Sequence, residues 1–463
     1  MMNNIFQKLG LGVTLAALLF SVSLTAVAQS KKDQKKAKQL TEQGDKAFRQ
    51  KNYRDALEQY SQAVALMPVN AYAHFWKGYS HYNLKENDQA LAEFDLALSQ
   101  KYKPLDVYKV RWFVNNDKKN YDAALEDIKE IMKLEPNNSD YLVALGDIYL
   151  GKGSYREALE PYQKAVLKFP NDGDLYYNIA KVQFNLGETQ GQASAAEEAL
   201  KKRTRNLGDA YYLLGDAYQK QKKNPEAIDA YQRAIASKPD IYLAYRNLAE
   251  LYRASNRIND AIDISKKGLV VFTNDGNIYT DLSWFYSLAD RHEDAVQAAQ
   301  AGIRFLPDQY LAYTNLCRAY NDLKKSELAI GACNSSLKLN PNDGETTYYL
   351  GRAYALAGKD AESARTYKKA ITGLLTYTTK NPDYSDGFYL LGNAYGADNQ
   401  LDKAVDAYKK CLELNPRFAK ARFNIGIISV IQKNKNGAME QYNKLLTIDK
   451  SLADKLKTEI DKL

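Results

Sequence analysis

A stretch of 34 residues, from Gly208 to Ile241, holds two amphipathic segments, and its pattern recurs along most of the chain. In the first segment, glycine and larger apolar or aromatic residues fall three or four positions apart, which places them on one side of a helix. The second segment repeats this spacing and is followed by Pro239, which cannot continue a helix. The stretch therefore predicts two short antiparallel helices joined by a polar turn.

A single helix pair of this size cannot bury its large tyrosines, so it needs similar pairs as neighbours. The sequence supplies them, because the same pattern returns with a spacing of 34 residues in all but two places. Twelve units begin at Ala37, Ala71, Leu105, Ser139, Gly173, Gly208, Tyr242, Gly276, Tyr310, Gly344, Ser385 and Ala419.

The residues that carry the pattern in the best-formed unit are Tyr211, Leu214, Gly215, Tyr218, Ala227, Tyr231, Ala234 and Pro239, at positions 4, 7, 8, 11, 20, 24, 27 and 32. This set closely resembles the tetratricopeptide repeat, whose period is 34. The resemblance implies an all-α solenoid, in which antiparallel helix pairs stack into a superhelix. It implies binding, but no particular ligand, because such repeats serve many unrelated tasks.

Three units depart from the pattern. The Gly173 unit is 35 residues long and lacks the closing proline, and we expect its second helix to be disturbed around Gly187 to Gly191. The Gly344 unit is 41 residues long, with its extra residues after Ala370, so we expect an extended second helix there. The Leu105 unit has Trp112 where glycine usually stands.

The sequence divides into a leader (1–28), a lysine-rich tail (29–36), the repeat array (37–451) and a C-terminal capping helix (452–463). The leader looks like a secretory signal peptide, with Lys8, an apolar run and Ala26-Val27-Ala28 before a cut at Gln29. We therefore expect export to the periplasm of a Gram-negative bacterium. The alternative is an uncleaved N-terminal membrane anchor, although the serines and threonine of the segment suit a spanning helix poorly.

Charge and motifs exclude several classes of function. The net charge of +8 lies largely before residue 39, so the repeat array carries no nucleic-acid-binding signature. The chain lacks the common nucleotide-binding, hydrolase and zinc-protease motifs. His74 and His81 occupy packing positions, which favours a core role over a metal site. With the array filling most of the chain, we expect no enzyme, no cofactor and no metal.

The three cysteines, Cys317, Cys333 and Cys411, stand at positions where small or apolar residues pack. Buried free thiols acting as small apolar side chains are one interpretation. The other applies to Cys317 and Cys333, which lie about equally far from the turn of one hairpin and face each other across it. In an exported protein that pair is able to oxidise, and the sequence leaves both states open.

In the family, positions 2, 5, 6, 9, 12 and 13 line the inner groove. Position 6 is an asparagine in four units, and the residue between two of them is an aspartate: Asn178, Asn247, Asp281, Asn315 and Asn424. This resembles the asparagine ladder in the repeats of O-linked N-acetylglucosamine transferases, where amides hold an extended peptide by its backbone. The ladder here is interrupted, and no transferase domain accompanies it.

Basic residues gather at groove positions in the second half of the chain. Arg246, Arg318 and Arg352 stand at positions 5, 9 and 9, with Arg253 at position 12 and Trp284 at position 9. We expect these arginines to select acidic side chains, since a guanidinium grips a carboxylate with two bonds. The alternative is that they are solvated or paired within the groove.

These observations predict a non-catalytic scaffold or adaptor of the cell envelope that binds other proteins or extended peptide segments in its groove. We expect it to bind no nucleic acid and to be peripheral to an envelope complex rather than membrane-embedded. The alternative is a carbohydrate- or cell-wall-binding module, in which Tyr72, Phe75, Tyr79 and Tyr82 form a stacking surface.

Overall fold

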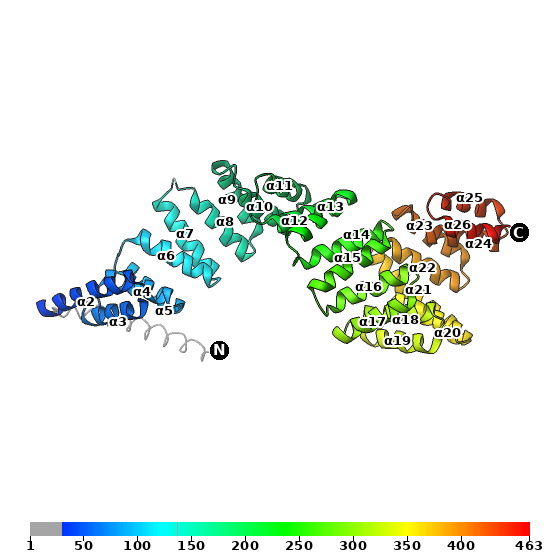
Figure 1. The fold of residues 1–463 in the computed structure, drawn as a ribbon, viewed down its shortest axis with the longest axis horizontal. Helices are drawn as coiled ribbons and strands as arrows, with labels where there is room; N and C mark the ends of the chain where they lie inside the picture. The colour runs from blue at the N-terminus through cyan, green and yellow to red at the C-terminus, as the bar shows by residue number, and fades with distance from the viewer. Residues whose placement is uncertain (1–29, 137) are drawn as a thin grey trace, which may run out of the picture. The chain divides into compact units, whose positions relative to one another are not determined.

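In the computed structural model, residues 30–136 and 138–463 are described, and they form twenty-five successive helices and no strand (Figure 1). The predicted all-α solenoid class is confirmed. The chain divides into two compact units, unit 1 up to Gln221 and unit 2 from Lys222 onward. This boundary falls in the turn of the stretch Gly208–Ile241, so its two helices belong to different units.

The helices of unit 1 are α2 (Lys31–Arg49), α3 (Tyr53–Leu66), α4 (Ala71–Asn83), α5 (Asn87–Ser99), α6 (Pro104–Asp117), α7 (Tyr121–Leu134), α8 (Asp140–Lys152), α9 (Tyr155–Lys168), α10 (Gly173–Leu186), α11 (Thr189–Lys201) and α12 (Leu207–Lys220).

The helices of unit 2 are α13 (Asn224–Ser237), α14 (Tyr242–Ala254), α15 (Ile258–Val271), α16 (Gly276–Leu288), α17 (His292–Phe305), α18 (Tyr310–Asp322), α19 (Ser326–Leu339), α20 (Gly344–Leu356), α21 (Asp360–Lys380), α22 (Ser385–Ala397), α23 (Leu401–Leu414), α24 (Ala419–Ile431), α25 (Lys435–Leu445) and α26 (Lys450–Ile460).

The turn inside each repeat uses one backbone conformation. One residue, the first or second after the end of the first helix, has a positive φ, which makes a left-handed turn there. Glycine or asparagine takes this conformation at little cost, yet lysine occupies it in half of the repeats. The residues are Lys51, Lys85, Lys119, Gly153, Gly187, Lys222, Asn256, Asp290, Lys324, Gly358, Asn399 and Lys433.

The two helices of a pair approach closely where a glycine at position 8 meets an aromatic ring at position 24. A Cβ placed on Gly146 would lie 2.6 Å from the ring of Tyr162, and one on Gly351 would lie 2.8 Å from Tyr367. The rings of Tyr162 and Tyr231 are fully buried. In the helix pairs that have glycine and an aromatic residue at these two positions, a small and a large residue therefore fill the centre of the pair.

The structure tests two of the predicted departures from the repeat pattern. Helix α21 runs to Lys380 and has 21 residues, so the expected extension after Ala370 is confirmed. The expected disturbance around Gly187 to Gly191 is wrong. Gly187 ends α10 with a φ of 73°, and α11 is continuous from Thr189.

Asp174 holds the loop of the unit that lacks the closing proline. It accepts hydrogen bonds from the Thr204 hydroxyl at 2.7 Å and from the Arg205 backbone N–H at 2.9 Å. These bonds fix the connection to α12 without a proline.

The predicted leader lies outside the described residues. Helix α2 begins at Lys31, inside the segment 29–36 that the sequence analysis treats as a tail. At the other end, α26 packs Leu456 and Ile460 into the last hydrophobic cluster. Across the part of the chain that is described, no helix combines the length and the apolar character that crossing a membrane requires.

Candidate functional site

A cavity of about 210 Å³ opens on the inner face of unit 2. Its lining comes from the first helices of five successive repeats, α16, α18, α20, α22 and α24, and from the residues that precede the last two. The side chains that matter for its chemistry are Trp284, Ser287, Arg318, Asp322, Glu345, Tyr348, Tyr349, Arg352, Tyr384, Asp386, Asn393 and Lys420.

Hydroxyl groups supply hydrogen-bond donors to this cavity. Burial raises the pKa of Tyr348, Tyr349 and Tyr384, so these phenols stay neutral and keep their protons. Among the described residues, the hydroxyls of Tyr348 and Tyr384 have no hydrogen-bond partner. The hydroxyl of Ser287 is buried and likewise unpaired within the described chain. The cavity thus holds polar groups that a ligand is able to satisfy.

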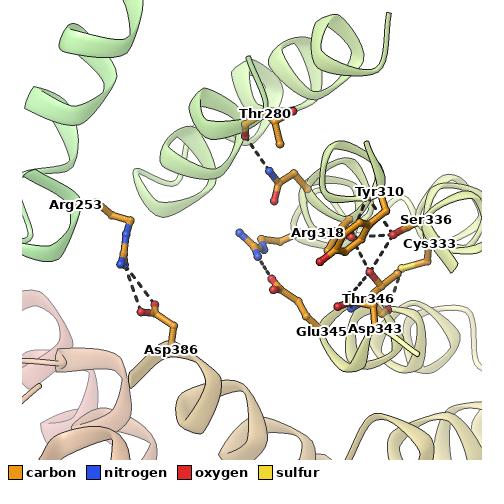
Figure 2. A network of polar contacts seen from close by, with 12 residues as sticks. Arg253, Thr280, Tyr310, Arg318, Cys333, Ser336, Asp343, Glu345, Thr346 and Asp386 are labelled. Carbon is orange, nitrogen blue, oxygen red and sulfur yellow. Dashed lines mark hydrogen bonds and ion pairs between the residues drawn. The ribbon is translucent and has the colours of Figure 1, made fainter. Parts of the chain in front are cut away.

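Two ion pairs inside the cavity join successive repeats. Arg318 on α18 pairs with Glu345 on α20 (Figure 2), and burial raises the pKa of Glu345. Arg352 on α20 donates to Asp322 on α18 at 2.7 Å. Both arginines therefore have carboxylate partners within the protein, as the alternative interpretation of the sequence proposed. Lys420 has no such partner among the described residues.

A third arginine reaches across the stack. Arg253 on α14 forms an ion pair with Glu250 at 2.6 Å and lies 4.5 Å above the ring of Trp284. Its remaining nitrogen points toward Asp386 on α22, at 3.4 Å (Figure 2). Arg253 and Asp386 are 133 positions apart in the sequence. Helices α14 and α22 therefore lie close together in unit 2, although their repeats are not neighbours in the chain.

The structure brings together three of the predicted site residues, Trp284, Arg318 and Arg352, which line the same cavity. It does not bring Arg246 there. Arg246 forms a two-point ion pair with Asp281, with distances of 2.7 and 3.2 Å. That pair also joins neighbouring repeats, so it resembles the other two arginine–carboxylate contacts.

The predicted asparagine ladder consists of hydrogen bonds between repeats. Asn247 donates to the Tyr231 hydroxyl at 3.1 Å, and Asn315 donates to the Thr280 carbonyl at 2.9 Å. The side chain of Asn178 lies in unit 1 and donates to Asp147 at 3.3 Å. Whether these amides also hold a ligand stays a prediction. The hydrogen bonds to neighbouring repeats are enough to account for their regular spacing.

The hydrogen bonds of Asn424 show why an asparagine recurs at position 6. Its amide donates to the Tyr408 hydroxyl at 3.1 Å and to Asn393 at 3.0 Å, while Tyr408 itself donates to Asn393 at 2.8 Å. A tyrosine at position 24, a polar residue at position 9 and an asparagine at position 6 of the next repeat thus form one network. Sequence reasoning missed this signal, because it compared asparagines with one another and not with the preceding tyrosines.

Sequence reasoning also missed Ser287, Tyr348, Tyr384, Asp386 and Lys420 as cavity residues. Four of them stand at groove positions 12, 5, 2 and 2 of their repeats, so a search over all inner positions would have found them. Tyr384 precedes α22, in the insertion that lengthens the Gly344 unit, and no repeat position pointed to it.

The aromatic surface suggested for a carbohydrate is only partly available. Phe75 is 6% exposed and packs against Phe94 and Tyr102, so it belongs to the core. The rings of Tyr79 and Tyr82 stack on each other with centroids 6.2 Å apart. The predicted four-residue stacking surface is therefore wrong for Phe75, which is buried because position 5 of this helix faces its own hairpin.

The cysteine question has a clear structural answer. Cys317 on α18 and Cys333 on α19 form a disulfide, which the sequence left open. Cys411 is a free, buried thiol, and burial raises its pKa to about 12. The disulfide lies next to Arg318 in sequence, so it fixes the helix that supplies part of the cavity wall.

Comparison with known families supports the repeat assignment. Models of the tetratricopeptide repeat match residues 41–104, 208–241 and 385–418, and a model described as TPR repeat matches residues 146–187.

Similar curated proteins match only over short segments. Protein O-mannosyl-transferase TMTC1 of Homo sapiens is 31% identical over 103 residues, covering 22% of this chain and 12% of that protein. Small glutamine-rich tetratricopeptide repeat-containing protein 2 of Saccharomyces cerevisiae is 31% identical over 104 residues, covering 22% and 30%. The chain thus spans less than a third of the length of these relatives.

Similar solved structures include the APC/C hetero-tetramer Cut9-Hcn1, with 15% identity, a TM-score of 0.43, and coverage of 92% of this chain and 96% of that one. Yeast Tom70 has 13% identity and a TM-score of 0.41, with 93% and 96% covered. The recurring 34-residue unit, the unbroken series of helix pairs and the matching repeat models agree with one another. The chain is therefore a tetratricopeptide repeat protein with many repeats.

Proposed function

We propose that this protein is a non-catalytic scaffold that binds an extended segment of another protein along the inner face of unit 2. Proteins of this family generally act as interaction scaffolds, and their concave surfaces are the usual binding faces. The single observation that carries the proposal is the 210 Å³ cavity, which five successive repeats line with aromatic rings and unpaired polar groups. A cavity of this size suits one side chain of a bound segment rather than a whole domain.

The chemistry of the cavity favours a peptide over a substrate that is converted. Arg318 and Arg352 are held by Glu345 and Asp322, so the charges are balanced and fixed. The phenols of Tyr348 and Tyr384 offer donors to backbone carbonyls or side-chain oxygens. Such a surface positions and recognises a ligand through rings and hydrogen bonds.

The proposal also includes where in the cell the protein acts. We place the protein in the cell envelope, in the periplasm, because of the signal-like leader and because a disulfide is stable in an oxidising compartment. N-terminal sequencing of the protein isolated from its host tests this. A mature chain beginning at Gln29 supports export, and retention of Met1 or Met2 contradicts it.

Selection from a random peptide library, with the purified protein as bait, tests groove binding. Selected peptides are re-measured by fluorescence anisotropy against Tyr348→Ala and Lys420→Glu, which change the cavity. Lys409→Glu is the matched control, because Lys409 is an exposed lysine on the second helix of a repeat, α23. Loss of binding with the first two variants and not with the control supports the proposal. Selected peptides that bind all variants equally contradict it.

A further inference from the structure

The contact between Arg253 and Asp386 differs from the other ion pairs of the inner face. Arg246, Arg318 and Arg352 each pair with a carboxylate of an adjacent repeat. Arg253 instead meets Asp386 from a repeat much further along the chain. Asp386 also lines the cavity, so the contact lies at the edge of the proposed binding site.

Arg253 is held firmly without Asp386. Two of its nitrogens donate to Glu250 at 2.8 and 2.6 Å, and its guanidinium lies over the ring of Trp284 at 4.5 Å. Charged hydrogen bonds of that length and a cation over a tryptophan face are both favourable. These contacts do not involve Asp386, so they hold the guanidinium in place if that carboxylate moves away and leave Nη1 for another carboxylate.

Asp386 is held loosely. Its two oxygens lie 3.5 and 3.4 Å from the Arg253 nitrogen, near the outer limit of a hydrogen bond. Among the described residues it has no other hydrogen-bond or ion-pair partner. The negative charge of Glu345 also acts on it, since Asp386 contributes to the raised pKa of that carboxyl. Like charges held together inside a groove repel each other, which weakens the position of Asp386.

The cavity also holds a cation without a partner. Lys420 lines it from α24, and within the described chain it forms no ion pair. Lys420 therefore adds to the cavity a positive charge that no carboxylate of the described chain pairs with. The site thus has a fixed guanidinium, a weakly held internal carboxylate and a spare ammonium group.

From these contacts we propose that Asp386 stands in the place of a ligand carboxylate, and that unit 2 binds extended peptides with acidic side chains, one of which replaces Asp386 on Arg253. This inference rests on the proposed function, because it names the class of peptide that the same groove takes. It predicts that the internal aspartate competes with the ligand, so that its removal strengthens binding.

The test uses two labelled peptides, one in which Glu alternates with Ser and an isosteric one in which Gln replaces Glu. Fluorescence anisotropy measures their Kd for the full chain. The Glu peptide is expected to bind about tenfold more tightly than the Gln peptide. Asp386→Asn should tighten the Glu peptide about fivefold and leave the Gln peptide within about twofold, because only the competing charge is removed.

Arg253→Gln should remove the preference for Glu. The matched control is Arg257→Gln, because Arg257 likewise pairs with a carboxylate three residues away, that of Asp260 at 2.6 Å, and lies 4.5 Å over a tyrosine ring. Within the described residues it forms no ion pair with a distant repeat. This control should keep the preference. Circular dichroism of each variant checks folding, and Asp386→Ala is the second variant if Asp386→Asn loses helix content.

Three results overturn the inference. Equal binding of the two peptides removes the acidic preference, while library peptides that still depend on Tyr348 leave the proposed function standing. An unchanged or weaker Kd of the Glu peptide with Asp386→Asn removes the competition. Failure of both peptides to bind Asp386→Asn removes the ligand class. By contrast, failure of the proposed function shows as library peptides that ignore every change in the cavity.

Discussion

The ring of Tyr408 packs so closely over Gly392 that a Cβ on the glycine would lie 2.5 Å from it. Cys317 and Cys333 stand at the same two positions of their own repeat, with a sequence separation of 16. In one repeat the helices are brought together by a missing side chain and a large ring. In the other they are joined by a covalent bond. The same position pair thus holds a hairpin together in two chemically different ways.

Gly392→Ala is expected to destabilise the protein by about 1–3 kcal/mol, because the added Cβ would overlap the ring of Tyr408, which is 3% exposed. Thermal unfolding followed by circular dichroism measures the change. The matched control is Gly331→Ala, since Gly331 is an exposed residue of helix α19 with nothing within 4 Å of an added Cβ. Alanine there should stabilise by about 0.5–1 kcal/mol. Equal effects of the two changes would contradict the packing argument.

The helix pairs could be predicted from the sequence because each repeat carries the pattern independently. The pattern extends over twelve units, with glycine at position 8 in seven of them and tyrosine at position 24 in six, so one unclear unit does not hide the period. The extension of α21 was visible as an insertion after Ala370. The disturbance expected near Gly191 was wrong, because a glycine inside a helix costs only about 1 kcal/mol and packing supplies more than that.

The binding face was harder to predict, because a repeat pattern says which face a residue lies on and not what it meets there. Trp284, Arg318 and Arg352 were found, and they share one cavity. The contact of Arg253 with Asp386 joins repeats that are far apart in the chain, and it depends on how steeply the stack of unit 2 turns. That turn is a sum of small rotations between repeats, and no single motif encodes it.

The disulfide predicts a defined thiol count. Unfolded protein kept under non-reducing conditions should react with Ellman's reagent at one thiol, Cys411, and reduced unfolded protein at three. The folded protein should react slowly at all of them, because Cys411 is buried and its pKa is raised to about 12. Three reactive thiols before reduction would show that the disulfide does not form.

Reduction should also lower stability. Closing a loop of 16 residues restricts the unfolded chain, which corresponds to about 3 kcal/mol in the chain-entropy model. Melting curves with and without a reductant measure this difference. The control is Cys317→Ala with Cys333→Ala, whose Tm should not respond to the reductant.

Glu93 gives unit 1 a dependence on pH. Burial alone would raise its pKa, but hydrogen bonds from His74 at 2.6 Å and from Lys77 outweigh burial and lower it. A carboxyl with a lowered pKa in the folded state adds stability above its unfolded value of about 4.5, and this stability is lost as the pH falls through the folded pKa.

Glu93→Gln should therefore cost about 1–2 kcal/mol at neutral pH, and the difference from the unchanged protein should shrink as the pH falls below 4.5. Urea unfolding at several pH values measures it. Glu130→Gln is the control, because Glu130 is 42% exposed and its ion pair among the described residues is with Lys133 on its own helix. That change should have little effect at any pH. A cost for Glu93→Gln that is constant with pH would contradict the assignment.

Arg318 distinguishes a structural from a ligand-binding role for the inner arginines. Its side chain is 12% exposed, and its partner Glu345 is also largely buried, so Arg318→Ala leaves a carboxyl without its cation. The expected cost is about 3 kcal/mol. Replacing both residues, as Arg318→Ala with Glu345→Ala, should restore part of it, because no buried charge then remains. Arg352→Ala should cost less, about 1 kcal/mol, since the Arg352 side chain is 36% exposed. Urea unfolding gives the three values. If Arg318→Ala leaves stability unchanged but weakens peptide binding, the guanidinium contributes to ligand binding and not to the stability of the stack. The structural role assigned to its pair with Glu345 would then be wrong.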